Sequence, residues 1–383
     1  MEFVEKYLKE AEKMNLLRKL IKVDNKTPGS ITIDGREYSD FSSNDYLGLS
    51  RHPKLIEAAV KAAKEYGVGS TSSRLMTGSL KLHHELEEKT ALFKFKQASL
   101  VLNSGYQANV GLIGALSGGG IVFADKLSHA SMIDGMLLSG CRFLRFKHND
   151  MDHLESLLQK EKRGLKNALI ITETVFSMDG DVCPLDTLVK IKEKYGVRLF
   201  VDEAHATGIF GKNGSGLAEE LGLTGRIEYI MGTFSKALGS FGAYIALAEK
   251  EKEFLVNTLR SFIYSTALPP SVIAANLAAL EVVKEEPERR KALKEKYVSF
   301  RKKSSDEGLK VLGVSQIVPV LIGENEEAVK ASVYLRSKGY WVTHIRPPTV
   351  PEGTARIRIS ISSSSTEESL NGLIEELKKC KVK

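Results

Sequence analysis

The sequence predicts an α/β fold with a mostly parallel sheet in a large domain and a smaller C-terminal α+β domain. Short β-branched runs alternate with helical patterns from about residue 30 to about residue 270. Several runs, such as 168–172 and 197–201, are almost continuously apolar, which is typical of strands buried on both faces. The helical patterns between them favour parallel crossovers. The length of 383 residues leaves room for one large core and a second domain.

The expected elements follow in chain order. Residues 1 to about 30 have the pattern of an amphipathic helix followed by a turn at Pro28-Gly29. The apolar runs predict strands at 99–102, 120–124, 142–146, 168–173, 197–202, 228–233 and 243–247. His83 and His84 are expected on the exposed side of a helix. After a break at 268–270 come a long charged helix, strands at 317–322, 340–345 and 356–361, and a helix at 366–379. We expect an N-terminal segment at 1–40, a large domain at 41–270 and a small domain at 271–383.

Composition limits the class of protein. The sequence has no run of eighteen apolar residues and begins with a charged amphipathic stretch, so we expect neither a membrane partner nor a signal peptide. Cys141, Cys183 and Cys380 show no CxxC spacing, which favours a reducing compartment, by default the cytoplasm, and argues against a bound metal. The net charge is +7, but basic residues alternate with Glu, as in 286–296, so we expect no nucleic-acid partner.

One lysine has an unusual setting. Between Glu228 and Glu249 the chain carries a single charge, Lys236, within the small and apolar segment 233–242. Poor solvation disfavours the ammonium form and makes the amine available as a nucleophile toward carbonyls, which is the chemistry of a Schiff base. The alternative is a lysine that extends from a buried strand end to solvent.

Polar residues after the strands supply further candidates, because ligands bind beyond the carboxyl ends of parallel strands. Gly105 and Tyr106 lie in a Ser-Gly turn that opens a helix, where a phosphate can sit, although such turns are common without a ligand. Asp202 would pair with a protonated ring nitrogen or cap a helix. His205 would donate to a cofactor oxygen, and His129 would stack on a flat ring or serve a structural role. Together these signals fit pyridoxal 5'-phosphate (PLP).

Five segments resemble those of the α-oxoamine synthases, a family of fold-type-I PLP-dependent transferases. Their order and spacing match the family at 41–48, 127–131, 174–180, 202–205 and 233–236. The resemblance implies an enzyme that condenses an amino acid with an acyl thioester and releases carbon dioxide. Segments 260–270 and 345–351 are most similar to members that join L-alanine to a pimeloyl thioester in biotin synthesis. The alternatives are a glycine acetyltransferase that uses acetyl-CoA, and a ligand-binding protein without activity.

The resemblance also implies roles for individual residues. Lys236 would form the Schiff base and then act as the base at Cα, Asp202 would pair with the pyridine nitrogen, and His129 would stack over the ring. The other cofactor-binding residues would be Gly105, Tyr106, Ser177, His205 and Thr233, and the substrate-binding residues would be His129, Arg18, Arg346 and Thr349.

The resemblance further implies a homodimer in which Asn44 and Ser265-Thr266 reach toward the partner's site. The acyl group would arrive on coenzyme A or on an acyl carrier protein. Where many relatives have a Gly-Gly pair, this chain reads Ser-Thr-Ser-Ser within 69–74. No cofactor or acyl contact is therefore carried over to that loop.

Overall fold

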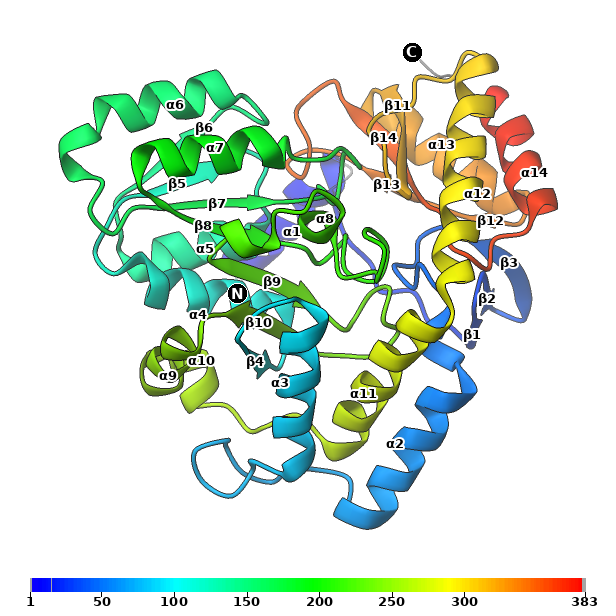
Figure 1. Cartoon of the computed structure of the whole chain (residues 1–383). Coiled ribbons are helices and arrows are strands. Elements are labelled where there is room, and N and C mark those ends of the chain that lie inside the picture. The colour runs from blue at the N-terminus through cyan, green and yellow to red at the C-terminus, as the bar shows by residue number, and fades with distance from the viewer. Residues whose placement is uncertain (1, 15, 381–383) are drawn as a thin grey trace. The chain divides into compact units, whose positions relative to one another are not determined.

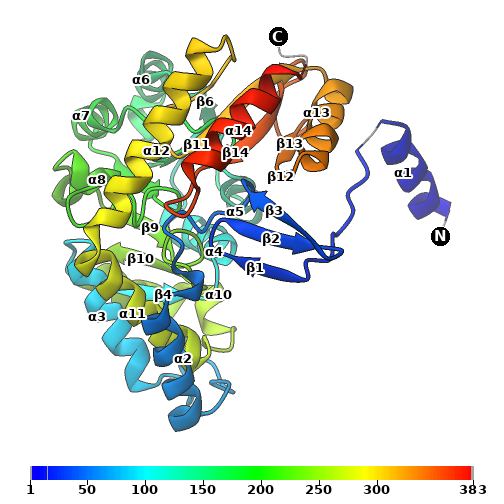
Figure 2. The same cartoon turned by 90° about the vertical axis from the view of Figure 1, so that its right-hand side faces the viewer.

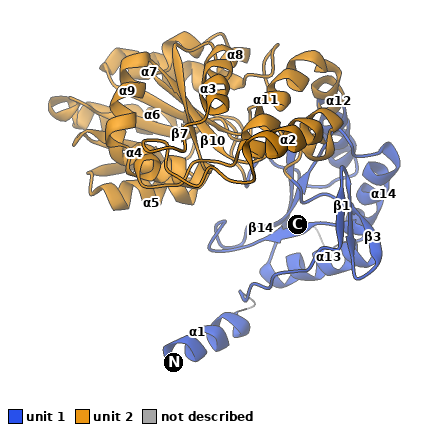
Figure 3. Ribbon diagram, turned by 90° about the horizontal axis from the view of Figure 1, so that it is seen from below, with its two compact units in different colours: residues 1–43, 178–180, 294–383 blue, residues 44–177, 181–293 orange. Residues whose placement is uncertain are grey.

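The computed structural model describes residues 2–14 and 16–380. These residues form two compact units, coloured separately in Figure 3. Unit 1 comprises residues 1–43, 178–180 and 294–383, and unit 2 comprises 44–177 and 181–293. Because compactness does not show which part folds independently, the expected domain limits stay a prediction.

Unit 2 is built around one large sheet. Within the described residues this sheet has seven strands in the order β4-β10-β9-β8-β7-β5-β6. The strands are β4 (Ala98–Leu102), β5 (Val122–Asp125), β6 (Phe143–Phe146), β7 (Leu169–Glu173), β8 (Arg198–Asp202), β9 (Tyr229–Thr233) and β10 (Ala243–Leu247). The helices are α2 (Pro53–Tyr66), α3 (Lys81–Phe93), α4 (Gly105–Ser117), α5 (Ala130–Ser139), α6 (Met151–Lys160), α7 (Leu185–Tyr195), α8 (Leu217–Glu220), α9 (Glu249–Thr258), α10 (Arg260–Ile263) and α11 (Pro270–Glu285), with short 3₁₀ turns η1 (Leu49–Arg51), η2 (Lys162–Gly164) and η3 (Thr224–Arg226).

The large sheet agrees with the sequence prediction. Each expected strand is present, with limits that differ by at most two residues. The β5–β6, β5–β7, β7–β8 and β8–β9 pairs are parallel, whereas β10 is antiparallel to both β9 and β4. The segment 234–242 that joins β9 to β10 is too short for the helical crossover that a parallel pair requires.

Both faces of the sheet are covered. Figure 1 shows α4 and α5 on one side of the strands and α6 and α7 on the other. Every residue of β4, β7, β9 and β10 is buried. Leu112 of α4 and Met132 of α5 pack in one apolar cluster with Ile171 and Phe200 of the strands. This core holds the carboxyl ends of the parallel strands at one edge of the sheet, where polar residues follow.

Unit 1 contains two smaller sheets. The first has the order β1-β2-β3-β12 and the second the order β11-β14-β13. The strands are β1 (Asn25–Thr27), β2 (Ser30–Ile33), β3 (Arg36–Asp40), β11 (Ile317–Gly323), β12 (Tyr340–Trp341), β13 (Thr343–Ile345) and β14 (Ala355–Ser360). The helices are α1 (Glu2–Lys13), α13 (Asn325–Ser337) and α14 (Glu367–Lys378), and α12 (Pro287–Asp306) begins in unit 2 and ends in unit 1.

The N-terminal region differs from the prediction. Helix α1 ends at Lys13, and the strands β1 to β3, blue in Figure 2, form an antiparallel meander that was not predicted. The expected Pro28-Gly29 turn joins β1 to β2, with Gly29 at φ 83°. Asp34 and Gly35, both at positive φ, make the second hairpin turn. The strand expected at 340–345 is divided between the two sheets.

Two kinds of feature are absent from the described residues, 2–14 and 16–380. None of the helices there is long and apolar enough to cross a membrane. The same residues contain no group of three or more His, Cys, Asp or Glu side chains that could hold a metal ion.

Candidate active site

Lys236 lies on the loop that follows β9. Its neighbours Phe234, Ala237 and Leu238 are buried, and they fix the backbone while the lysine itself is half-buried. Gly239, at φ 66°, donates its N–H to the Lys236 carbonyl at 2.9 Å and leaves no room for a side chain beside Ser50. The loop therefore presents one amine from a tightly packed backbone.

Asp202 is the last residue of β8 and is 6% exposed. The side-chain amide of Asn109 donates to its Oδ2 at 2.9 Å, and the backbone N–H of Ala204 donates to its Oδ1 at 2.8 Å. Asn109 also donates to Ser131 Oγ at 3.0 Å. The carboxylate is therefore held in one orientation at the carboxyl edge of the sheet.

His129 caps the N-terminus of α5. Its Nδ1 accepts the N–H of Ser131 at 3.2 Å and lies 2.7 Å from Ser131 Oγ, so Ser131 and Asn109 link this ring to Asp202. Burial lowers the pKa of His129, the Asp202 carboxylate opposes that shift, and the Lys236 ammonium adds to it. The Lys236 and Asp202 charges therefore both act on the His129 ring.

His205 and Tyr46 are buried partners. The Tyr46 hydroxyl donates to Asn44 Oδ1 at 3.0 Å and lies 2.8 Å from His205 Nδ1. Tyr46 therefore connects Asn44 to the His205 ring within unit 2. The expected reach of Asn44 to a partner subunit stays a prediction.

Ser177 lies in the turn of the loop between β7 and α7, beyond the Val175–Val182 bridge. Next to it, the Phe176 N–H donates to the Asp181 carbonyl at 3.0 Å. His148 bridges Asp125 Oδ1 at 2.9 Å and Asp181 Oδ2 at 2.7 Å. Although burial lowers the pKa of His148, the hydrogen bonds with these two carboxylates raise it to about 10. A charged imidazole thus fixes one side of this loop at neutral pH.

The N-terminus of α4 fits the phosphate end of a PLP molecule. Ser104 caps the helix by accepting the Gln107 N–H at 3.2 Å, and a Cβ on Gly105 would lie 2.8 Å from Thr233 Cγ2. Thr233 Oγ1 is buried and has no hydrogen-bond partner among the described residues. A helix N-terminus beside an unsatisfied hydroxyl suits an anionic oxygen. Tyr106 is more open, and its hydroxyl donates to Asp134.

Sequence reasoning missed Glu173, the last residue of β7. It stands opposite Asp202 in the β7–β8 register and is 3% exposed. Burial first, and then the Asp202 carboxylate, raise the pKa of Glu173 to about 8, although Lys236 and the His129 N–H oppose this. Its Oε1 has no hydrogen-bond partner among the described residues. The sequence did contain a signal for this residue, because Glu173 is an acidic side chain at the end of an apolar strand.

The expected substrate residues belong to unit 1. Arg346 follows β13 and is half-buried, while Arg18 and Thr349 are exposed. Burial and the nearby Arg18 guanidinium lower the pKa of Arg346. Thr349 donates its N–H to the Arg346 carbonyl at 3.1 Å. Guanidinium groups whose charges act on each other in this way are suited to binding carboxylates.

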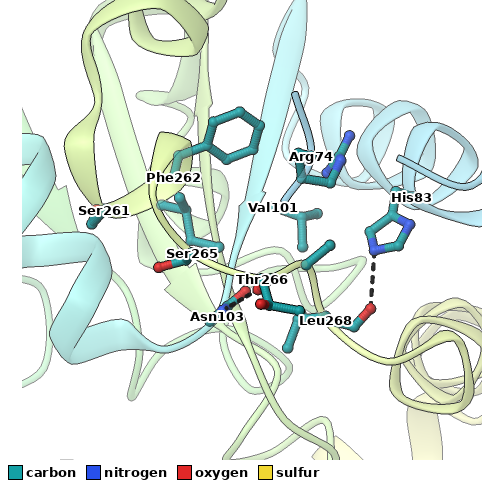
Figure 4. A pocket seen from close by; sticks show the side chains of 11 residues that line it. Arg74, His83, Val101, Asn103, Ser261, Phe262, Ser265, Thr266 and Leu268 are labelled. Carbon is teal, nitrogen blue, oxygen red and sulfur yellow. Dashed lines mark hydrogen bonds between the residues drawn. The ribbon is translucent and has the colours of Figure 1, made fainter. Parts of the chain in front are cut away.

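A small cavity of about 10 Å³, the size of one water, lies beside β4 (Figure 4). Asn103 donates to the Thr266 carbonyl at 2.8 Å, and Gln107 donates to Ser265 Oγ at 2.5 Å. Ser73 forms a β-bridge with Thr266, so the loop at 69–74 packs against Ser265-Thr266, the segment expected to reach a partner subunit. That reach stays a prediction.

The expectation for His83 was wrong. This residue is 1% exposed, and its Nε2 donates to the Leu268 carbonyl at 3.1 Å (Figure 4). Burial, with the Arg74 guanidinium, lowers the pKa of His83 to about 4. His83 is therefore a neutral structural residue on the buried face of α3.

The fold and these strand-end residues define a PLP-dependent enzyme of fold type I. The chain matches the model of the aminotransferase class I and II family over residues 36–377, and it belongs to that family. The 8-amino-7-oxononanoate synthase of Geobacter sulfurreducens is 47% identical over 95% of this chain and 94% of its own length. The corresponding synthase of Pelobacter propionicus is 43% identical over 98% of this chain and 96% of its own.

Solved structures of similar fold lead to the same family of enzymes. Serine palmitoyltransferase from Sphingomonas wittichii superposes with a TM-score of 0.92 at 29% identity, covering 99% of this chain and 96% of that chain. The 8-amino-7-oxononanoate synthase of Francisella tularensis gives 0.77 at 30% identity, covering 89% of this chain and 96% of that chain. These relatives confirm the predicted fold, the PLP dependence and the resemblance to 8-amino-7-oxononanoate synthases. The roles of single residues stay predictions.

Proposed function

We propose that this enzyme condenses L-alanine with a pimeloyl thioester and releases carbon dioxide and the thiol. The product is 8-amino-7-oxononanoate, for biotin synthesis. The observation that carries the proposal is the identity of 42–47% over nearly the whole chain with relatives named 8-amino-7-oxononanoate synthase. The similarity to serine palmitoyltransferases is 29% at sequence level, which favours the first substrate pair over serine and palmitate.

Residues of unit 2 would carry the chemistry. Bound PLP supplies an electron sink for the charge left at Cα of the amino acid. The Lys236 amine removes and returns the Cα proton, and Asp202 holds a proton on the ring nitrogen. His129 covers the ring, and His205 and Ser177 contact its oxygen. Gly105, Tyr106 and Thr233 hold the phosphate end.

Residues of unit 1 would bind the substrates. Neither Arg346 nor Arg18 forms an ion pair with a carboxylate within the described residues. Arg346 would therefore bind the alanine carboxylate in a forked pair of hydrogen bonds, with Thr349 on the same loop, and Arg18 would contact substrate beside it.

The test is a substrate comparison with the purified PLP-loaded enzyme. L-Alanine is supplied with pimeloyl-CoA or with pimeloyl acyl carrier protein, and a separate arm supplies glycine with acetyl-CoA. Product mass and thiol release are measured. We expect turnover with alanine and a pimeloyl donor, and the donor arms show which carrier is used. Faster turnover with glycine and acetyl-CoA would replace this proposal with the acetyltransferase, and no turnover in any arm would favour the binding protein.

We also propose a cytoplasmic homodimer. Leu75, Met76 and Tyr264 are large apolar side chains with exposed fractions of 51%, 77% and 72%. They lie on two segments joined by the Ser73–Thr266 bridge, which supports a buried role for this surface in an assembly. Sedimentation should give twice the mass of one chain, and Tyr264→Glu should shift it toward the monomer. A monomeric wild-type protein would contradict the proposal.

A further inference from the structure

The loop that carries Arg346 and Thr349 is a hairpin connection. We call residues 346–354, between β13 and β14, the substrate hairpin. The two strands pair antiparallel, and Ile345 stands opposite Arg356, so these residues form the base of the hairpin. The position of Arg346 therefore depends on what holds this base.

Arg356 holds the base of the hairpin. It is 3% exposed, its Nε donates to the Thr354 carbonyl at 3.0 Å, and its Nη2 donates to Thr354 Oγ1 at 3.1 Å. Nη1 donates to Asp179 Oδ1. The Arg356 guanidinium thus binds both the end of the substrate hairpin and the Asp179 carboxylate, which comes from a distant part of the sequence.

Asp179 is itself fixed in place. The N–H groups of Val314 and Ser315 donate to the Gly180 carbonyl at 2.9 and 3.0 Å. A Cβ on Gly313 would lie 2.3 Å from the Asp179 carbonyl oxygen, and a Cβ on Gly180 would lie 2.0 Å from the Ile317 carbonyl oxygen. Because both glycines have positive φ and no space for a side chain, this contact permits little movement.

A second arginine holds the segment against which Asp179 packs. The Arg301 guanidinium donates to the carbonyls of Leu312 and Gly313 at 2.7 Å, Ser315 at 3.0 Å and Ile317 at 2.7 Å. The continuous series of contacts runs from Arg301 to the 312–317 segment, to Asp179, to Arg356 and to the substrate hairpin. All of these residues lie in unit 1.

We propose that Asp179 and Arg356 are positioning residues of the amino-acid site, because their ion pair fixes the substrate hairpin that presents Arg346 and Thr349. The proposal rests on the proposed function of Arg346. Without the pair, a buried guanidinium loses its counter-charge and the base of the hairpin loosens. Amino-acid affinity should then fall, whereas the cofactor residues of unit 2 keep their own contacts.

The experiment compares three variants of the PLP-loaded enzyme. Asp179→Asn keeps the shape and removes the charge. Thr354→Val removes one neutral acceptor of Arg356, together with the bond from the Thr354 hydroxyl to the Pro351 carbonyl within the hairpin. The control is Glu193→Gln, which breaks an exposed ion pair with Arg226 in unit 2. Alanine affinity is read from the change in visible absorbance without an acyl donor, KM and kcat are measured with the donor, and PLP affinity is measured by dialysis.

We expect Asp179→Asn to raise the dissociation constant and KM for alanine about tenfold, with kcat and PLP affinity within about threefold of wild type. Thr354→Val should raise alanine KM about threefold, and the control should change nothing. Unchanged alanine affinity in Asp179→Asn, or a parallel loss of PLP affinity, would overturn the proposal. If Asp179→Asn does not fold, Thr354→Val decides in the same way.

Amino-acid binding to the wild-type protein distinguishes a failure of the positioning role from a failure of the proposed function. A wild type that binds a different amino acid contradicts the alanine assignment, and the variants are then compared with that amino acid. If the wild type and Asp179→Asn bind alanine equally tightly, the proposed function stands and the positioning role of Asp179 is excluded.

Discussion

The cofactor residues and the substrate residues are organised differently. In unit 2, the strand-end residues Asp202, His205 and Thr233 are at most 6% exposed, and side-chain hydrogen bonds hold Asp202 and His205 without substrate. His129 and Tyr106, which also belong to the expected cofactor site, are exposed. In unit 1, Arg18 and Thr349 are exposed and Arg346 is half-buried. A cofactor that stays bound allows a rigid, buried site, whereas substrates that enter and leave in each turnover require an open one. The predictions below test this contrast, from the largest expected effect to the smallest.

Replacing Lys236 should have the largest effect. Lys236→Ala removes the amine that joins PLP and moves the Cα proton, so turnover should fall by at least about 10³-fold. The visible absorbance of the covalently joined cofactor should disappear. Lys250→Ala, at an exposed position on α9, is the matched control and should behave as wild type. Retained absorbance and turnover in Lys236→Ala would remove the lysine from the mechanism.

Replacing Arg346 should affect the substrate and leave the cofactor in place. Arg346→Gln removes a forked, charge-assisted contact, so the KM for alanine should rise about 10²-fold with little change in PLP affinity. Arg346→Lys keeps the charge and should fall between this variant and wild type. If Arg346→Gln lowers PLP affinity as much as alanine affinity, the contrast between a cofactor site and a separate substrate site is contradicted.

Thr233 should show the opposite selectivity. Thr233→Val removes a buried hydroxyl that lacks a partner in the described residues, so the protein without cofactor should melt at the same or a higher temperature. PLP should bind about tenfold more weakly, because the hydroxyl is expected to donate to its phosphate. Thr233→Ser, which keeps the hydroxyl, is the control. Unchanged PLP affinity in Thr233→Val would exclude this contact.

Glu173 should give a small effect that depends on pH. Its pKa rises from 4.5 to about 8 on folding, so the folded protein binds more protons than the unfolded chain between these values. Its contribution to stability is therefore present below about pH 4.5 and is lost as pH rises toward 8. Urea unfolding of the cofactor-free protein should show this decline relative to Glu173→Gln. Parallel pH profiles for the two proteins would contradict it.

Much of the large sheet could be predicted from the sequence, because most of its strands are buried on both faces and therefore have nearly continuous apolar runs. The reversed direction of β10 could also have been predicted from the short 234–242 connection. The β1–β3 meander was harder to predict, because its strands are short and only partly buried. The Asp34-Gly35 turn was its clearest signal.

The site was only partly predictable for a different reason. Asp202 and Lys236 stand out locally, one at a strand end and one in an uncharged segment. Asn109 acts through partners far away in the sequence, and no local pattern indicates those contacts. Glu173 had a local signal, an acid at the end of an apolar run, but its raised pKa depends on burial and on Asp202. His83 was misplaced for the same reason, since its partner is the Leu268 carbonyl.

The composition of unit 1 from three separate pieces of chain has a consequence for biosynthesis. Strand β3 pairs with β12, and the Ser360 N–H donates to the Phe41 carbonyl at 2.8 Å. The meander can pair within itself early in synthesis, but β3 gains its neighbour β12 only after about 300 further residues have been made. We expect nascent chains arrested before Tyr340 to keep the β1–β3 meander sensitive to protease, while the large sheet of unit 2 already resists digestion.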